Sequence, residues 1–261
     1  MSNYKVIDKE NYYRKGVFKH FSEDCKCSVS MTSRIDVTSL VEYSKETNTK
    51  FYINFLYVLS KVLNSRDDYK MGYLWQTDTL ICYDVINPTH YVFHEDTETC
   101  TPVYSVYDEN YEVFYKNATG DIEKAKQTRE YGLDAENHPN WFDASYISWL
   151  SYDSLNIELP DGYLYFSPII NWGKYREENG RLLMPVTVRL NHAIADGYLA
   201  PAGIENVCVA VIPDAGYYLA PYTGQPTPDY AAIRAADQTL ANWKDPPKDF
   251  DRIVYDKETL M

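Results

Sequence analysis

The segment from residue 191 to residue 197, Asn-His-Ala-Ile-Ala-Asp-Gly, holds the side chains best suited to chemistry. The imidazole of His192 ordinarily titrates near neutrality, so it can take a proton from a substrate and return it. Asp196 can bond locally or pair with a distant cation, and Gly197 permits the positive φ that a sharp turn requires. Alone, a histidine in such a place is more often structural or exposed than catalytic.

The residues before this segment must position the histidine. Residues 182–190 alternate between polar and apolar types and predict a strand, so His192 would lie where that strand leaves its sheet. Asn179-Gly180 predicts a tight turn just before the strand. Residues 27–37 alternate in the same way and predict a second half-buried strand. A histidine at such a strand exit can be held rigidly while it faces a cleft.

The rest of the chain predicts a mixed α/β architecture. We expect helices at 10–21, with Asp8 as N-cap, at 51–63, and at 108–131 with a break at Gly120. Residues 71–75 and 79–83 predict a hairpin. Further strands are expected at 90–93, 97–106, 143–149, 154–157 and 163–175.

Composition and charge limit the classes of function. A net charge of −13 over 261 residues argues against nucleic-acid binding, which needs clustered Lys and Arg. No stretch approaches the roughly 20 apolar residues of a membrane span, and the first residues lack the apolar core of a signal peptide. The five cysteines fit no metal-ligand spacing. We expect a soluble, cytoplasmic protein with free thiols, no metal and no membrane contact.

Six stretches of this chain, in order, resemble the chloramphenicol acetyltransferase family. The most specific is His-x-x-x-Asp-Gly at His192. The others are Asn11-Tyr-Tyr-Arg-Lys15 with Phe18, the strand 30–37, Phe93-His-Glu-Asp-Thr-Glu-Thr99, Trp172-Gly-Lys-Tyr175, and Leu182-Leu-Met-Pro185. Together they cover roughly residues 4–200.

The resemblance implies a fold and an assembly. Its members are two-layer α/β sandwiches, in which helices cover a mixed β-sheet, and they form homotrimers with active sites between subunits. We therefore expect an acetyltransferase domain over 1–212, ending in a helix at 200–212. Residues 213–261 would be a C-terminal extension of unknown role.

The resemblance also implies a reaction, the O-acetylation of chloramphenicol by acetyl-CoA, which inactivates the antibiotic. His192 would be the general base that deprotonates the acceptor hydroxyl, without an acyl-enzyme. Ser145 would donate a hydrogen bond to the oxyanion of the tetrahedral intermediate, and losing such a donor costs about 10²–10³ in turnover. Asp196 and Arg14 would form a buried ion pair that holds the turn bearing the histidine.

The same resemblance assigns binding roles. Trp149, Lys174 and Tyr175 would line the CoA channel, although ordinary sheet packing explains them nearly as well. The positions that would contact the acceptor are Phe21, Val29, Cys100 and Ile157.

Three residues depart from the family pattern. Asn191 stands where the family has a first histidine, and Cys100 stands where it has an aromatic residue at the antibiotic surface. Phe21 replaces a tyrosine and so removes a hydroxyl donor. The changes at Cys100 and Phe21 leave open the same chemistry on another hydroxyl- or amine-bearing small molecule. The C-terminal extension, which has no counterpart in the family, leaves open a catalytically silent scaffold with this fold.

Overall fold

The computed structural model describes residues 3–132, 137–159, 164–196 and 220–221. The chain divides into two compact units, Met1–Tyr222 and Thr223–Met261, and the second lies outside the described residues. The helix expected at 200–212 and the domain boundary expected at 212 also fall outside them, so both stay predictions.

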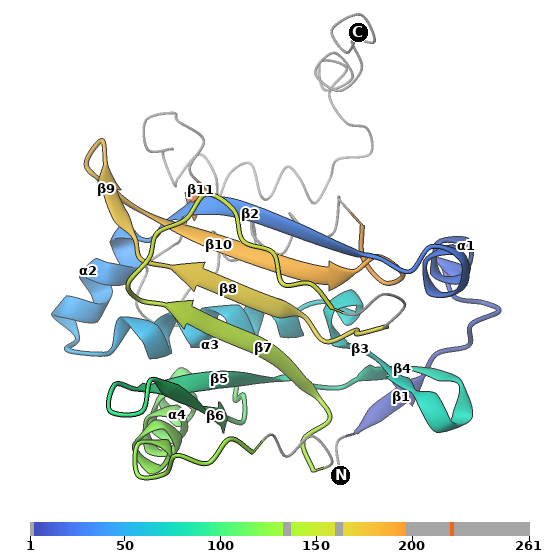
Figure 1. Ribbon diagram of the computed structural model, residues 1–261, viewed down its shortest axis with the longest axis horizontal. Helices are drawn as coiled ribbons and strands as arrows, with labels where there is room; N and C mark the ends of the chain where they lie inside the picture. The colour runs from blue at the N-terminus through green and yellow to red at the C-terminus, as the bar shows by residue number, and fades with distance from the viewer. Residues whose placement is uncertain (1–2, 133–136, 160–163, 197–219, 222–261) are drawn as a thin grey trace, which may run out of the picture. The chain divides into compact units, whose positions relative to one another are not determined.

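One large mixed sheet organises the first unit (Figure 1). Its strands follow the order β11-β2-β10-β8-β7-β5-β6, with the short β9 paired to β10. The bounds are β11 (Ala220–Pro221), β2 (Ser28–Asp36), β10 (Arg181–Asn191), β8 (Ile169–Gly173), β7 (Trp141–Ile147), β5 (Asn87–His94), β6 (Thr99–Tyr104) and β9 (Arg176–Glu178). The pairs β8–β7 and β7–β5 are parallel, and all other pairs are antiparallel. The expected mixed sheet is confirmed.

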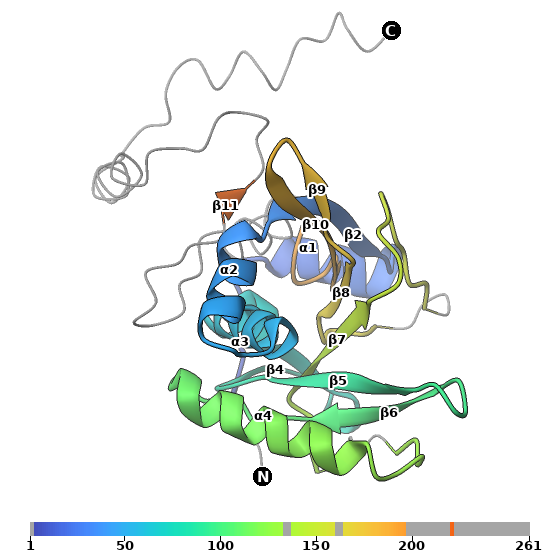
Figure 2. The ribbon, with the colours of Figure 1, turned by 90° about the vertical axis from the view of Figure 1, so that its left-hand side faces the viewer.

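Helices cover one face of this sheet (Figure 2). They are α2 (Thr38–Glu46), α3 (Phe51–Asn64) and α4 (Tyr111–Ala125). α3 supplies eight buried side chains to an apolar core that also receives alternate residues of the strands, among them Trp172, Val186 and Ala144. Strand alternation sends every second side chain of the sheet into this core. With one layer of helices on one face of the sheet, the expected two-layer sandwich is confirmed.

The opposite face of the sheet, which we call the outer face, carries the other half of each strand. There the connection from β7 to β8 crosses β8, β10 and β2 as an extended segment (Figure 1). The Tyr152 hydroxyl donates to the Asn171 carbonyl (2.9 Å), the Ser30 hydroxyl donates to the Leu155 carbonyl (3.4 Å), and Asp153 pairs with Arg34. Gly173 permits this crossing, since a Cβ there would lie 2.6 Å from the Leu150 carbonyl oxygen.

A smaller antiparallel sheet joins β1 (Tyr4–Val6), β4 (Thr79–Tyr83) and β3 (Met71–Leu74). The expected hairpin of β3 and β4 is confirmed, and Asp78 closes it at a left-handed φ of 51°. The turn expected at Asn179-Gly180 is also confirmed, with φ values of 53° and 77° between β9 and β10.

The first helix is shorter than expected. It is α1 (Lys15–Lys19), and a π-helical turn η1 (His20–Asp24) follows it. The expected start was wrong because the Asp8 carboxylate accepts the backbone N–H of Glu10 (2.9 Å) and the side-chain amide of Asn11 (2.6 Å). Asp8 therefore closes a local turn, which competes with helix formation.

Two other expectations need correction. α4 runs unbroken through Gly120, which has open space where a Cβ would lie, so that glycine costs about 1 kcal/mol without ending the helix. The side-chain oxygen of Asn110 caps α4 by accepting the backbone N–H groups of Glu112 and Val113. Residues 154–157 form no strand, because they belong to the segment that crosses the outer face.

Candidate functional site

His192 lies directly after the last residue of β10, at the strand exit that the sequence predicts. Its backbone N–H donates to the Cys27 carbonyl (3.0 Å), so the turn stays attached to the residue before β2. The side-chain oxygen of Asn191 accepts the N–H of Ala193 (2.9 Å), and the Asn191 carbonyl accepts that of Ala195 (3.0 Å). The asparagine therefore shapes the turn that presents His192.

The His192 ring stacks on Phe21 of η1, with centroids 3.7 Å apart and planes 15° from parallel. Its Nδ1 is buried and has no hydrogen-bond partner among the described residues. Face-to-face contact at this distance restricts rotation of the imidazole. Phe21, which is expected to contact the acceptor, thus lies against His192, which is expected to act as the base.

Arg14 and Asp196 lie on either side of this turn. Arg14 Nη1 is 3.1 Å from Asp196 Oδ2, and the Arg14 side chain is only 10% exposed. Because Arg14 immediately precedes α1 and Asp196 follows the turn, their pair attaches the turn to the helical segment that carries Phe21. Breaking a pair with one buried partner is costly even where its net stabilisation is small.

Ser145 lies elsewhere, on the outer face of β7. It is in register with Asn171 of β8, which is in register with Thr187 of β10. His192 follows Thr187 by five residues, so at about 3.3 Å per residue it lies roughly 16 Å further along the sheet. No described residue is hydrogen-bonded to the Ser145 hydroxyl. A single chain therefore does not bring its own His192 and Ser145 together.

The residues expected to line the CoA channel lie where β7 and β8 end. The backbone N–H of Lys174 donates to the Leu150 carbonyl (2.7 Å), which joins the two strand ends. Trp149 is 67% exposed, and its nearest aromatic ring is that of Phe93, 5.7 Å away. Tyr175 packs edge-to-face on Phe51. The exposed indole of Trp149 and the nearby Lys174, at the ends of two central strands, can hold an aromatic, anionic molecule.

The residues expected to contact the acceptor are spread across the sheet. Val29, paired with Leu190, packs against the apolar core next to the turn of His192. Cys100 lies on β6 at the other edge, opposite Phe93, and burial raises the pKa of its thiol. Ile157, 38% exposed, lies in the segment that crosses the outer face. Within one chain these three residues surround no common point.

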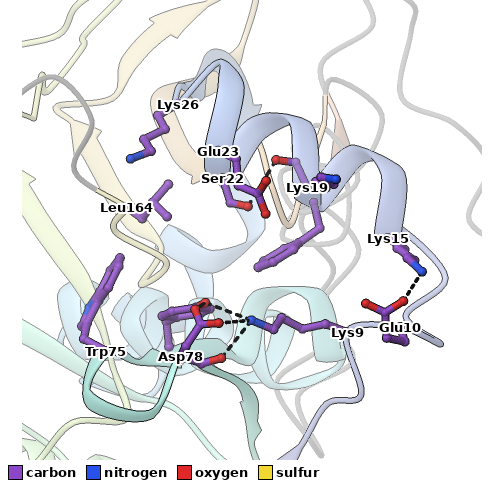
Figure 3. Close-up of a pocket in the computed structure, with 12 residues that line it drawn as sticks. Lys9, Glu10, Lys15, Lys19, Ser22, Glu23, Lys26, Trp75, Asp78 and Leu164 are labelled. Carbon is purple, nitrogen blue, oxygen red and sulfur yellow. Dashed lines mark hydrogen bonds and ion pairs between the residues drawn. The ribbon is translucent and has the colours of Figure 1, made fainter.

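A pocket of about 330 Å³ lies between α1–η1 and the hairpin of β3 and β4 (Figure 3). Lys9 and Asp78 are ion-paired there, as are Lys15 and Glu10, and Trp75 and Leu164 form an apolar side. None of the residues expected to take part in catalysis or binding lines it. Two of its lysines are already neutralised, so the pocket offers little net charge to a ligand.

Comparison with known proteins places the chain in a family. The family model described as chloramphenicol acetyltransferase matches residues 2–207. The chain belongs to the chloramphenicol acetyltransferase family. Relatives include "Chloramphenicol acetyltransferase 3" of Escherichia coli, 32% identical over 199 residues that cover 75% of this chain and 91% of the relative. A chloramphenicol acetyltransferase of Clostridium perfringens is 30% identical over 195 residues, covering 75% and 89%.

Solved structures agree on the fold. A chloramphenicol acetyltransferase structure superposes with a TM-score of 0.71 at 21% identity, covering 78% of this chain and 98% of its own. The catalytic core of a 2-oxoacid dehydrogenase complex from Thermoplasma acidophilum gives a TM-score of 0.55 at 14% identity, covering 78% and 96%. As a member of the chloramphenicol acetyltransferase family, the chain is an acyltransferase enzyme. No helix among the described residues is long and apolar enough to span a membrane.

Sequence reasoning missed a polar cluster on the outer face next to Ser145. It consists of Thr89, Tyr91, Asp143, Tyr165 and Arg189. The signal was available for Arg189 and Asp143, because each interrupts an alternating strand with a charge on the face away from the apolar core. Residues two positions apart on a strand point the same way, so Asp143 could have been placed beside Ser145.

Proposed function

We propose that this enzyme transfers the acetyl group of acetyl-CoA to the hydroxyl of chloramphenicol, as a homotrimer with its active sites between subunits. The proposal depends above all on His192, held at the end of β10 by the Cys27 carbonyl and stacked on Phe21, in a chain of this family. In this reaction His192 removes the hydroxyl proton as the acceptor oxygen attacks the thioester carbon. Ser145 donates a hydrogen bond to the resulting oxyanion.

The remaining steps need no covalent enzyme intermediate. Collapse of the tetrahedral intermediate breaks the bond from carbon to sulfur, and the leaving CoA thiolate accepts the proton that His192 took from the acceptor hydroxyl. Arg14 and Asp196 hold the turn during this cycle. Trp149, Lys174 and Tyr175 would bind CoA at the end of β7 and β8.

The subunit arrangement follows from the distance between the two catalytic side chains. His192 and Ser145 of one chain lie too far apart to act on one carbonyl, so we infer that His192 of one chain meets Ser145 of its neighbour. Cyclic homo-oligomers repeat such a contact at every interface. The phenyl ring of Phe21 would accompany His192 into that interface.

A mixing experiment tests the chemistry and the interface together. Chains with His192→Ala and chains with Ser145→Ala, each nearly inactive, are produced together with different tags, and release of CoA thiol with chloramphenicol is measured. One interface in four then combines an intact histidine with an intact serine, so activity should return to roughly a quarter of wild type. No recovery in isolated mixed oligomers would reject the shared site. Turnover of the His192→Ala chain equal to that of the wild type would reject His192 as the general base.

A second function keeps the chemistry and changes the acceptor. It is favoured by Cys100, which supplies no aromatic ring on the outer face where Phe93 already lies exposed. A smaller side chain in an apolar site changes discrimination by about 1–3 kcal/mol. An acceptor screen with acetyl-CoA separates the two, since this alternative leaves chloramphenicol nearly inert. A scaffold would show neither turnover nor CoA binding by calorimetry.

A further inference from the structure

Arg189 is a buried cation that has no counter-charge within the part of the chain that the structure describes. Its side chain lies on the outer face of β10, and the residue is only 7% exposed. Among the described residues, Nη1 has no hydrogen-bond partner and no carboxylate forms an ion pair with the guanidinium. Burial lowers the pKa of Arg189, the opposite of what a paired carboxylate would do. A guanidinium in this condition is costly, so a site that keeps one needs an anion for it.

Asp143 is the second charge on this face. Asp143 and Arg189 are both in register with Ile169 of β8, one on either side, so about two strand spacings, roughly 10 Å, separate their Cα atoms. The Ile169 side chain lies between them, and the two charges form no ion pair. Asp143 Oδ1 accepts the Tyr91 hydroxyl (2.9 Å). The hydroxyl of Thr89, which is in register with Asp143, is buried and has no partner in the described ranges.

These groups lie on the side of Ser145 that faces the end of β10. Asp143 precedes Ser145 by two residues on β7, and Arg189 follows Thr187 by two on β10, so both lie about 7 Å from the row that contains Ser145. The phenol of Tyr165 interacts electrostatically with Arg189 and with Tyr91, which places it within the same cluster.

We propose that Arg189 and Asp143 extend the acceptor range beyond chloramphenicol: the site prefers a hydroxyl acceptor that also carries a carboxylate, bound by Arg189, and a hydrogen-bond donor that faces Asp143. This inference rests on the proposed function, because Ser145 marks where the acetyl group is transferred. Chloramphenicol has no anionic group and leaves the guanidinium unpaired. Charged and polar groups buried in a site discriminate strongly against molecules that leave them without partners.

Two acceptors that differ only in charge test the proposal. N-(4-nitrobenzoyl)-L-serine and its methyl ester share the aryl amide and the hydroxyl. With the full-length enzyme and acetyl-CoA, we expect kcat/KM for the acid to exceed that for the ester by roughly 10- to 100-fold, the range for hydrogen bonds to charged groups. The acid should also inhibit chloramphenicol acetylation more strongly than the ester, which gives a measurement even if both serine compounds turn over slowly.

Arginine variants assign the preference to a residue. Arg189→Gln should bring the ratio of kcat/KM for the acid to kcat/KM for the ester close to one. Arg189→Lys should retain part of the preference for the acid. Arg34→Gln is the matched control: Arg34 is also an arginine on the outer face, but it is exposed and paired with Asp153 and Glu178, so the ratio should stay at the wild-type value.

The outcomes separate this inference from the proposed function. Equal kcat/KM and equal inhibition by acid and ester, with chloramphenicol still acetylated, would overturn the inference alone. Loss of the oligomer in Arg189→Gln, measured by light scattering, together with an unchanged ratio in Arg189→Lys, would make Arg189 an interface residue and also overturn it. Absence of CoA binding and of turnover with any acceptor would reject the proposed function itself.

Discussion

The two faces of the main sheet differ in chemistry although the same strands form both. On the helix-covered face, alternate residues such as Trp172 and Ala144 enter one apolar core with α3 and α4. On the outer face, their immediate neighbours Asn171 and Ser145 are polar, and none of the described helices packs over them. Nearly all candidate chemistry of the sheet lies on the outer face. The helix-covered face therefore supplies the stability that lets the outer face keep polar and charged groups.

The faces also differ in how their polar groups are satisfied. His90, on the helix-covered side, contacts the Tyr52 hydroxyl (3.0 Å) through Nδ1 and the Ser105 hydroxyl (3.1 Å) through Nε2. On the outer face, the Thr89 hydroxyl and Nη1 of Arg189 have no partner among the described residues. Nε1 of Trp172, in the helix-covered core, is also buried without a partner among the described residues, so unbonded groups alone do not distinguish the faces. The outer face differs in that one of its unbonded groups, the Arg189 guanidinium, carries a charge.

Removing a large side chain from the helix-covered face should have the largest effect. Trp172 is fully buried, with its ring centroid 5.1 Å from Phe55 and 5.7 Å from Tyr146. Trp172→Ala should lower the free energy of unfolding by about 3–5 kcal/mol, since the cavity cannot collapse within a sheet. Urea unfolding followed by circular dichroism measures it.

Trp149→Ala is the matched control for this prediction. The indole of Trp149 is mostly exposed at the end of β7, so removing it should change the free energy of unfolding by no more than about 0.5 kcal/mol. Its effect should instead fall on CoA binding. Equal destabilisation by the two substitutions would contradict the division between the faces.

Much of the helix-covered face could be predicted from the sequence because it depends on local periodicity. The pattern of 51–63 specified α3 within one residue, and alternation in 182–190 placed His192 at a strand exit. Periodicity could not predict which segments pair side by side. The separation of His192 from Ser145 is a matter of register between β10, β8 and β7, which no local pattern records.

Local signals failed where tertiary contacts or competing bonds decided the structure. Asp8 is a good N-cap by type, but its carboxylate closes a turn before the helix begins. Residues 154–157 have a strand-like composition, yet they cross the outer face and pair with no strand, and their neighbour Tyr152 bonds to Asn171. Gly120 breaks no helix because its site is open. Local patterns likewise carry no record of the contacts that the outer face would make in the proposed oligomer.

Acid should act on the helix-covered face through His90. Burial lowers the pKa of His90 to about 3, against 6.5 for an exposed histidine. Below pH 6.5 the unfolded chain binds a proton that the folded chain does not, so stability falls as pH falls, at about 1.4 kcal/mol per pH unit. Between pH 7 and pH 4.5 we expect this residue to cost about 2–3 kcal/mol of unfolding free energy.

His90→Gln isolates that contribution. A glutamine keeps hydrogen-bonding capacity toward Tyr52 and Ser105 but stays neutral at every pH. The wild type should therefore lose its advantage over the variant as the pH is lowered from 7 to 4.5, as measured by urea unfolding at each pH. Curves that stay parallel over this range would show that His90 is charged in the folded protein or does not titrate there.

The smallest effect should come from the outer face, with the opposite sign. Burial raises the pKa of Asp143 above the ordinary 3.8 of an aspartate, and the Tyr91 hydroxyl offsets this only in part. The folded chain then holds a proton more tightly than the unfolded chain, so this residue destabilises the protein at pH 7, and the penalty fades as the pH falls toward 3.8. Asp143→Asn, which keeps an oxygen for Tyr91, should raise the unfolding free energy at pH 7 by less than the other two changes alter it.

The gain from Asp143→Asn should shrink at pH 4.5, where the His90 effect grows. The control Asp153→Asn, on an exposed carboxylate, should give no gain at either pH. A destabilised Asp143→Asn at pH 7 would mean that the charge of Asp143 already has a favourable partner, and that the outer face is satisfied in the same way as the helix-covered one.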